Sequence, residues 1–452
     1  MPENRDLESN ATQQPAQEPE QPGYTSPTAG RGSRLPAIFG LLSGAAIAVG
    51  GFAVRSLVRS VRRKINRTEA DPVRLPSDTQ TSSGADEPAS TISANDIYVT
   101  DLQLAAAKHL RWLIDKIELS DNEFVAAGWF LSFAHGPEEI QFLLNGKPFT
   151  ATDWPLPSPD LLNYYANIPG AGNAKFVCRQ RFADLQEIFP DGYARLSVVN
   201  RLGEHRRSYR SAWFFPDPRS PLPVPDGARI ARVIGTDNLE SFLIGGATVA
   251  KRFESFLQDR FDRSLASFSS ILDWGCGCGR LTRHLITATG STVTGADIDA
   301  DNIQWCRDNL KSANFEHLAL RPPMPFADEQ FDLVIGISVL THLAEEDQFL
   351  WLSELQRITK PGALLLLSIR GSAQMSLYKQ PPELYVALQR KGFLDSGLNT
   401  QLEGVLDDGE FYRDVNQSRD YIFAKWDKYF DVLEVVDALA SNQDLVVLRR
   451  RA

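Results

Sequence analysis

Hydrophobic and polar positions alternate in short runs between residues 98 and 219, and turn residues separate the runs. A period of two residues is typical of strands that bury one face. Asn145 and Gly146 stand between two such runs, and both residue types tolerate the positive φ of a hairpin turn. The pattern predicts a small, separate antiparallel β-sandwich over 98–219, with strands at 117–119, 124–131, 140–144, 175–181, 194–200 and 207–215.

A proline-rich run at 216–225 ends this region, and the pattern then changes. From 226 to 452, strand-like and helix-like segments alternate, which is typical of a parallel sheet covered by helices on both faces. The last two strand-like segments, 431–436 and 445–449, predict an antiparallel pair that closes the sheet. The sequence therefore predicts an α/β domain at 226–452 beside the β-rich domain.

A segment without any charged residue extends from 35 to 54. At 1.5 Å per residue, a helix of about 20 residues covers the roughly 30 Å hydrocarbon core of a bilayer. The segment follows an acidic, proline-rich tail, unlike a signal peptide, and low-complexity stretches flank it, unlike a core helix. We expect a transmembrane helix at 35–54 after a disordered tail at 1–34.

Six basic residues follow this segment with no acidic residue among them: Arg55, Arg59, Arg62, Arg63, Lys64 and Arg67. Such a cluster is typical of the cytoplasmic flank of a span, so we expect a single-pass membrane protein with its folded domains in the cytoplasm. Residues 55–97 comprise this basic juxtamembrane segment and a flexible linker. Gly40 and Gly44, four residues apart, offer a contact for a homodimer within the membrane.

Composition sets limits on this picture. The 452 residues are 43% hydrophobic and 23% charged, which is ordinary for globular proteins and excludes a wholly disordered or multi-span chain. A net charge of −10 repels phosphate backbones, so we expect no nucleic-acid partner. The 4 cysteines have the spacing of neither a disulfide framework nor a closed zinc site, so we expect no metal.

A glycine-rich turn follows the short apolar strand predicted at 269–274 and leads into a predicted helix at 280–288. Its glycines let the backbone come close to a ligand, and the free N–H groups at a helix start attract anionic or polar groups. The dinucleotide fingerprint requires Gly or Ala at the position that Arg280 occupies here. The turn therefore indicates a ligand site but argues against a nicotinamide cofactor.

The next predicted strand, 291–296, ends in Asp297, about 20 residues after the glycine turn. An acidic side chain at this place accepts hydrogen bonds from both hydroxyls of a ribose. Asp299 suits this role less well because it lies toward the start of the following helix. The spacing predicts an adenosine-containing cofactor without a pyrophosphate.

At this point the chain resembles the class I S-adenosylmethionine-dependent methyltransferases. Five segments carry the resemblance, in family order: 271–280 (ILDWGCGCGR), 295–297 (GAD), 325–334 (PFADEQFDLV), 338–343 (SVLTHL) and 355–362 (LQRITKPG). The resemblance implies a Rossmann-like, doubly wound sheet of seven strands in the order 3-2-1-4-5-7-6. It also implies S-adenosyl-L-methionine as the cofactor.

The resemblance further implies roles for single residues. Asp273 and the backbone of Gly275, Cys276, Gly277 and Gly279 would contact the methionine part of the cofactor, Asp297 the ribose, and Ile298 one face of the adenine. Residues 320–325 depart from the family pattern, so the contact to the adenine amino group stays unassigned.

His342, just past the fourth strand, is the candidate catalytic residue. A hydroxyl acceptor requires a general base, whereas a carboxylate acceptor does not, and a structural histidine in this loop is the alternative. We expect the acceptor pocket within residues 370–430, where Asp407, Asp408, Glu410, Tyr412, Arg413 and Tyr421 cluster in the sequence.

These observations favour a membrane-tethered methyltransferase that acts on a small-molecule or glycan-type acceptor. The acceptor class rests on analogy with modules attached to glycan-modifying enzymes. The alternative is a non-catalytic binding or scaffolding module on the same fold, and S-adenosylmethionine binding separates the two.

Overall fold

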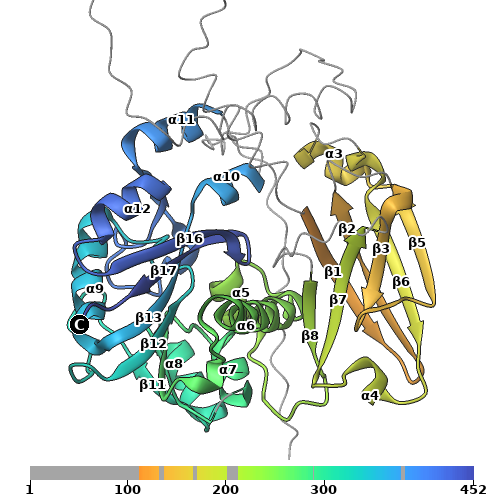
Figure 1. Cartoon of the computed structure of the whole chain (residues 1–452), viewed down its shortest axis with the longest axis horizontal. Helices are drawn as coiled ribbons and strands as arrows, with labels where there is room; N and C mark the ends of the chain where they lie inside the picture. Colours follow the sequence, from red (N-terminus) through yellow and green to blue (C-terminus); the bar gives the residue numbers. More distant parts are fainter. Residues whose placement is uncertain (1–110, 132–136, 166–169, 201–211, 289, 378–381) are drawn as a thin grey trace, which may run out of the picture. The chain divides into compact units, whose positions relative to one another are not determined.

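A computed structural model describes residues 111–131, 137–165, 170–200, 212–288, 290–377 and 382–452 (Figure 1). The predicted tail, membrane span and linker, with Gly40 and Gly44, lie outside the described residues. Within the described residues, no helix is long and apolar enough to cross a membrane.

Two four-stranded antiparallel sheets form in the β-rich region, with the orders β1-β2-β6-β5 and β4-β3-β7-β8. The strands are β1 (Arg111–Leu119), β2 (Glu123–Leu131), β3 (Ile140–Leu144), β4 (Lys147–Pro148), β5 (Ala151–Leu156), β6 (Lys175–Arg181), β7 (Tyr193–Asn200) and β8 (Ala212–Pro216). Short helices connect them: η1 (Pro137–Glu139), α3 (Pro159–Tyr165), η2 (Ala171–Asn173) and α4 (Leu185–Ile188).

Side chains of both sheets share one hydrophobic core. Burial alternates along β2 from Glu123 to Phe130, so Phe124 and Phe130 face inward while Val125 and Trp129 are partly exposed. Phe142 of one sheet and Phe176 of the other meet with ring centroids 4.4 Å apart. The hydrophobic residues that recur at every second position of the sequence thus form the inner face of each sheet.

The hydrophobic pattern predicts one local feature of this region, a hairpin turn, and misses another, strand β5. The Asn145-Gly146 turn joins β3 to β4 with φ values of 49° and 81°, which confirms the predicted hairpin. Strand β5 is not predicted by the pattern. It contains Pro155 and is mostly exposed, and it lies at the edge of its sheet, where a residue without an N–H group is tolerated.

The α/β part has a seven-stranded sheet with the order β11-β10-β9-β12-β13-β17-β16. Counted along the chain, this is 3-2-1-4-5-7-6, which confirms the predicted order. The strands are β9 (Ser270–Trp274), β10 (Thr292–Asp297), β11 (Asn314–His317), β12 (Phe331–Gly336), β13 (Thr359–Ile369), β16 (Asp431–Ala440) and β17 (Gln443–Arg449). Only β17 runs antiparallel to its neighbours on both sides, as the predicted closing pair requires.

Helices cover both faces of this sheet. One face packs on α6 (Leu239–Phe261) and α7 (Thr282–Ala288), and the other packs on α9 (Glu345–Ile358) and α12 (Arg419–Trp426). Alternate strand residues serve the two faces: Leu364 and Leu366 of β13 join the first core, and Leu365 and Leu367 join the second. Burial on both sides explains the continuous apolar run in this strand.

Two further helices and a segment after β13 complete the α/β part. Helix α5 (Gly227–Ile234) precedes α6, and α8 (Ala300–Asn309) follows β10. The segment after β13 contains α10 (Ser372–Leu377), α11 (Pro382–Lys391), β14 (Phe393–Leu398), η5 (Thr400–Leu402) and β15 (Arg413–Gln417). Strands β14 and β15 pair as a separate two-stranded sheet, which we call the acceptor-side hairpin (393–417).

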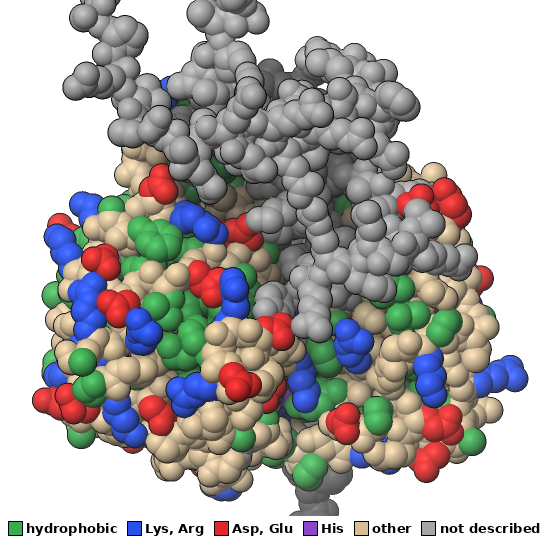
Figure 2. Space-filling model, in the orientation of Figure 1, with side chains coloured by type: hydrophobic (Ala, Val, Ile, Leu, Met, Phe, Trp, Pro, Cys, Tyr) green, Lys and Arg blue, Asp and Glu red, His purple; other side chains and the backbone are tan. Residues whose placement is uncertain are grey.

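Helix α6 also contacts the β-rich region. Its Ile244 belongs to the core of the two antiparallel sheets, and its Thr248 hydroxyl accepts a hydrogen bond from the Phe214 N–H at 3.0 Å. On the face drawn in Figure 2, acidic and basic side chains are interspersed over the described surface.

Candidate active site

The glycine-rich turn joins β9 to α7 at the carboxyl edge of the sheet. Gly275, Gly277 and Gly279 have φ values of 75°, 54° and 79°, in the left-handed region that favours glycine. A Cβ atom on Gly277 would lie 2.6 Å from Val233, and one on Gly279 would lie 2.5 Å from Leu310. Both the conformation and the packing therefore require glycine, and the main chain of the turn is left without side chains.

Asp297 ends β10 beside this turn. One carboxylate oxygen accepts the Gly277 N–H at 2.7 Å, and the other accepts the Asp299 N–H at 2.8 Å. Burial raises the pKa of the Asp297 carboxyl above its ordinary value, and these N–H groups oppose that shift. Each oxygen keeps a further lone pair, so Asp297 can still accept the two hydroxyls of a ribose.

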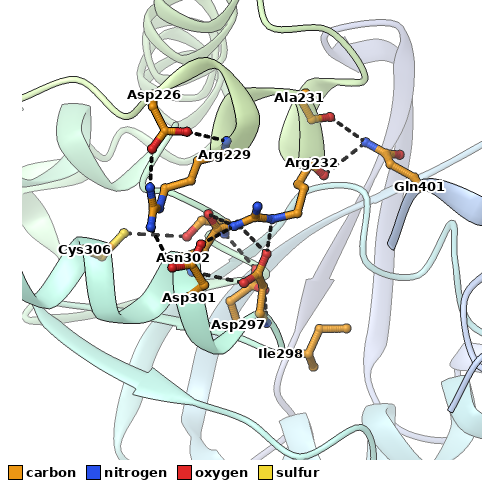
Figure 3. A network of polar contacts seen from close by, with 12 residues as sticks. Asp226, Arg229, Ala231, Arg232, Asp297, Ile298, Asp301, Asn302, Cys306 and Gln401 are labelled. Carbon is orange, nitrogen blue, oxygen red and sulfur yellow. Dashed lines mark hydrogen bonds and ion pairs between the residues drawn. The ribbon is translucent and has the colours of Figure 1, made fainter. Parts of the chain in front are cut away.

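Asp299 occupies a different position from Asp297. It is the N-cap of α8, and its side chain accepts the Asn302 N–H at 3.0 Å. The expectation that Asp299 belongs to the helix start is confirmed. Ile298 lies between the two carboxylates in the chain, and Figure 3 shows its side chain outside their polar network.

Asp273 and Cys276 lie deeper than the glycine turn itself. Asp273 is buried and accepts a hydrogen bond from the Thr282 hydroxyl at 2.6 Å, and burial raises the pKa of Asp273 to about 6. Cys276 is buried too, with its thiol against the Gly277 carbonyl at 3.6 Å. The Asp273 side chain thus ties β9 to the start of α7, and the Cys276 side chain packs under the turn.

His342 lies in the turn after β12 and is 4% exposed. Its Nδ1 lies 2.8 Å from the Arg413 carbonyl oxygen, which can only accept, so Nδ1 carries the proton and Nε2 holds a lone pair. The His342 ring stacks on Tyr412 with centroids 4.1 Å apart. Burial, then the charge of Arg370, lowers the pKa of His342 to about 4, which keeps the imidazole neutral at pH 7.

Polar side chains from the turn after β12 and from strands β13 and β17 form a network beside the Nε2 atom of His342. Ser338, at a φ of 63°, lies 3.5 Å from this nitrogen and 3.0 Å from the Thr341 hydroxyl. The Gln443 amide donates to the Ser338 hydroxyl at 3.0 Å, and Ser368 donates to the Gln443 carbonyl at 2.6 Å. A non-glycine residue with positive φ, held in such a network, is typical of a functional turn.

Sequence reasoning did not identify Arg370, Asp414 or Asn399 in this site. Arg370 follows β13 and pairs with Asp414, which also accepts from Asn399 at 2.8 Å. Asp414 lies 3.6 Å from His342 Nδ1. The position of Arg370 directly after a parallel strand was the available signal, because the carboxyl ends of such strands line the site. The other two residues come from the acceptor-side hairpin.

A cavity of about 610 Å³ lies next to this hairpin. Arg321 and the start of α9 form one side of it, and Asp395, Asp408 and Arg413 of the hairpin form the other. The Arg413 N–H donates to the His342 carbonyl at 3.0 Å, which fixes the hairpin to the turn that carries His342. Of the cluster noted in the sequence, Asp408, Glu410 and Arg413 line the cavity.

The residues at the carboxyl edge fit S-adenosylmethionine. The glycine turn presents main chain without side chains at this edge, and the Asp297 carboxylate beside it can accept the hydroxyls of a ribose. Both lie where the strand order reverses between β9 and β12, which is where open α/β sheets bind ligands. The residue that contacts the adenine amino group stays unassigned.

Comparisons with known proteins agree with this fit. Residues 271–362 match the family described as "Methyltransferase domain". Methyltransferase GfsG of Streptomyces halstedii is 31% identical over 134 residues, which cover 28% of this chain and 47% of that protein. A ubiquinone biosynthesis O-methyltransferase of a Ruegeria species is 28% identical over 169 residues, 30% of this chain and 67% of that protein. The chain thus spans about half the length of the first relative.

Solved structures also align with part of the chain. Human N-acetylserotonin methyltransferase in complex with SAM aligns over 47% of this chain and 53% of that chain, with 16% identity and a TM-score of 0.33. The PH0226 protein of Pyrococcus horikoshii aligns over 44% and 89%, with 18% identity and a TM-score of 0.33.

The family match supports two of the expectations drawn from the sequence. Residues 271–362 match a methyltransferase domain, and this match together with the methyltransferase relatives supports S-adenosyl-L-methionine as the cofactor. The roles of the single site residues stay predictions.

Proposed function

We propose that the protein is an S-adenosylmethionine-dependent methyltransferase whose cofactor lies against the glycine turn and Asp297. The observation that carries the proposal is the hydrogen bond between Asp297 and the Gly277 N–H at 2.7 Å. This contact supports the proposal because it brings the carboxylate that we expect to accept the ribose next to main chain without side chains. A scaffold without a ligand has no need of a half-buried carboxylate beside a glycine-rich turn.

When bound, S-adenosylmethionine supplies a methyl group on a positively charged sulfur. The protein then has to hold the acceptor atom in line with that methyl group and exclude water. Tyr412 and the Arg413 carbonyl fix the ring of His342, so its Nε2 atom keeps one direction. We assign Nε2 as the atom that takes the proton from a hydroxyl acceptor.

The acceptor is a small molecule or a glycan-type compound in this proposal. The cavity of about 610 Å³ has the size of a small-molecule site and lies beside the hairpin that holds His342. The curated relatives include O-methyltransferases of ubiquinone biosynthesis, which supports a hydroxyl acceptor.

We also propose that residues 35–54 tether the enzyme to a membrane with the catalytic domain in the cytoplasm. The support is the uncharged segment followed by six basic residues. A tether at this place keeps the acceptor site close to membrane-bound acceptors.

A methyl-transfer assay tests the proposed activity. Purified full-length protein is incubated with S-adenosylmethionine tritiated on its methyl group and with fractionated cell extract. We expect label to appear in a low-molecular-weight or lipid-linked product, and the label to be lost when Asp297 is replaced by Ala. Saturable cofactor binding without labelled product in any fraction would favour the scaffolding alternative.

A further inference from the structure

Helix α5 packs directly on the glycine turn of the cofactor site. Val233 occupies the space that a Gly277 side chain would fill, and Ile230 is 1% exposed in a core that it shares with Cys278. Asp226 caps the start of α5, and Gly235 ends it with a φ of 78°. The last turn of α5 therefore packs against the glycine turn through Val233.

Two arginines attach α5 to the ribose side of the site, as Figure 3 shows. Arg232 donates to the buried Asp299 at 2.7 Å and to Asp301 at 2.6 Å. Arg229 reaches Asp301 as well, at 2.6 Å. Because Asp299 also caps α8 next to Asp297, these ion pairs fix α5 to the segment that carries the ribose acceptor.

Gln401 attaches the last turn of α5, which also carries Arg232, to the acceptor-side hairpin. Its side-chain amide donates to the carbonyl oxygens of Ala231 at 3.3 Å and Arg232 at 3.0 Å (Figure 3). The Ala231 carbonyl also accepts the Gly235 N–H at 2.8 Å, and Arg232 lies in the last turn, where carbonyl groups lack partners within the helix, so the Gln401 amide adds a donor from the hairpin to the end of α5. The same hairpin carries Tyr412, which stacks on His342.

We propose that α5 is a clamp on the bound cofactor and that Gln401 is the positioning residue that links this clamp to the acceptor-side hairpin. The clamp holds at its ribose side through Arg232 and at its acceptor side through Gln401. This inference rests on the proposed cofactor site. Its consequence is that release of the demethylated cofactor requires α5 and the hairpin to separate, so an acceptor that orders the hairpin slows cofactor release.

Isosteric replacement of Gln401 tests the clamp. Gln401→Glu turns a donor into a carboxylate that faces two carbonyl oxygens at the negative end of a helix. Gln401→Lys keeps a donor and places a positive charge at the same end, which is favourable. We expect the dissociation rate of S-adenosylhomocysteine from full-length protein, measured by stopped-flow displacement, to rise at least fivefold for Gln401→Glu and to stay within twofold for Gln401→Lys.

Gln389→Glu is the matched control, because the Gln389 amide is also half-buried but donates to Ser372, away from α5. We expect this variant to release S-adenosylhomocysteine at the wild-type rate. Arg232→Ala is a second variant, at the ribose side. We expect its dissociation rate of S-adenosylhomocysteine to be at least fivefold above that of the wild type, and this difference to be smaller at high salt because salt screens the ion pairs of Arg232. The melting temperature of each variant is measured as well. If Gln401 only stabilises the fold, the melting temperature changes but Gln401→Glu and Gln401→Lys release S-adenosylhomocysteine at similar rates.

Two outcomes overturn different claims. If the wild-type protein binds S-adenosylhomocysteine but Gln401→Glu, Gln401→Lys and Arg232→Ala all release it at the wild-type rate, α5 is not a clamp and the proposed function stands. If the wild-type protein does not bind it, the proposed cofactor site fails and the clamp fails with it.

Discussion

The proposed cofactor site depends on Asp297 more than on any other side chain. Its carboxylate orders the glycine turn through Gly277 and is left with lone pairs for a ribose. We expect Asp297→Ala to weaken S-adenosylmethionine binding by about 1.5 to 3 kcal/mol, the range for hydrogen bonds to a charged group. Isothermal titration calorimetry measures the change.

Asp308→Ala is the control for this experiment, because Asp308 is an exposed carboxylate on α8. This variant should bind the cofactor like the wild type. Equal affinities for the wild type and Asp297→Ala would place the ribose elsewhere.

His342 predicts a pH-dependent stability. Its folded pKa of about 4 lies below the ordinary value of 6.5, so between these values the unfolded chain binds the extra proton and stability falls as the pH falls. Between pH 7.5 and 5 this histidine alone accounts for a loss of about 2 kcal/mol. In His342→Gln this contribution to the urea unfolding free energy should be absent. Identical slopes for wild type and His342→Gln would show that His342 is not buried as a neutral imidazole.

The sequence predicts some residues of this site and misses others for a physical reason. Gly277 and Asp297 are recognisable because the spacing from strand to turn to strand is local and fixed by the fold. Asp414 and Gln401 are not recognisable in this way. Their partners His342 and Arg232 lie 72 and 169 positions away along the chain, and only the folded hairpin brings them together.

Among the elements, the contact between the glycine turn and α5 is the most sensitive to a small change. Gly277→Ala adds a Cβ atom 2.6 Å from Val233 and strains a φ of 54°. We expect the affinity for S-adenosylmethionine to fall at least tenfold, because either the turn or α5 must move. Calorimetry measures the affinity, and circular dichroism verifies the fold.

Gly404→Ala separates backbone strain from steric overlap. Gly404 has a φ of 76°, but nothing lies within 4 Å of the added Cβ atom. This variant should lose some stability and keep the cofactor affinity of the wild type. An equal loss of affinity in both variants would mean that the packing of α5 on the turn is irrelevant to the cofactor.

The elements differ in how well their patterns predict them. Strands buried on both faces, such as β13 and β17, have continuous apolar runs that leave little ambiguity. Strand β5 has no buried face and contains a proline, so its residues do not show the alternation of hydrophobic and polar positions that predicts a strand. Helix α5 has only eight residues, and its ion pairs with Asp299 and Asp301 come from a segment that the local pattern of α5 does not indicate.

At the scale of the whole molecule, the predicted tether should determine whether the protein associates with membranes. Deletion of residues 35–67 removes the uncharged segment and its basic flank. We expect this variant to move from the membrane fraction to the soluble fraction and to bind S-adenosylmethionine with unchanged affinity, because the cofactor site lies entirely within the α/β part. Ultracentrifugation and calorimetry measure the two properties.

Deletion of residues 1–34 is the matched control, since it removes a tail of similar length and leaves the uncharged segment in place. This variant should stay with the membranes. If the variant without residues 35–67 still sediments with membranes, the tether lies elsewhere in the chain.

The central claim is the position of the cofactor, and a crystal structure of the protein with S-adenosylhomocysteine tests it most directly. The account predicts the ribose hydroxyls on the carboxylate of Asp297 and the amino-acid part along the main chain of Gly275 to Gly279, with α5 closed over it. A ligand bound away from this edge of the sheet, or none bound at saturating concentration, would contradict the account.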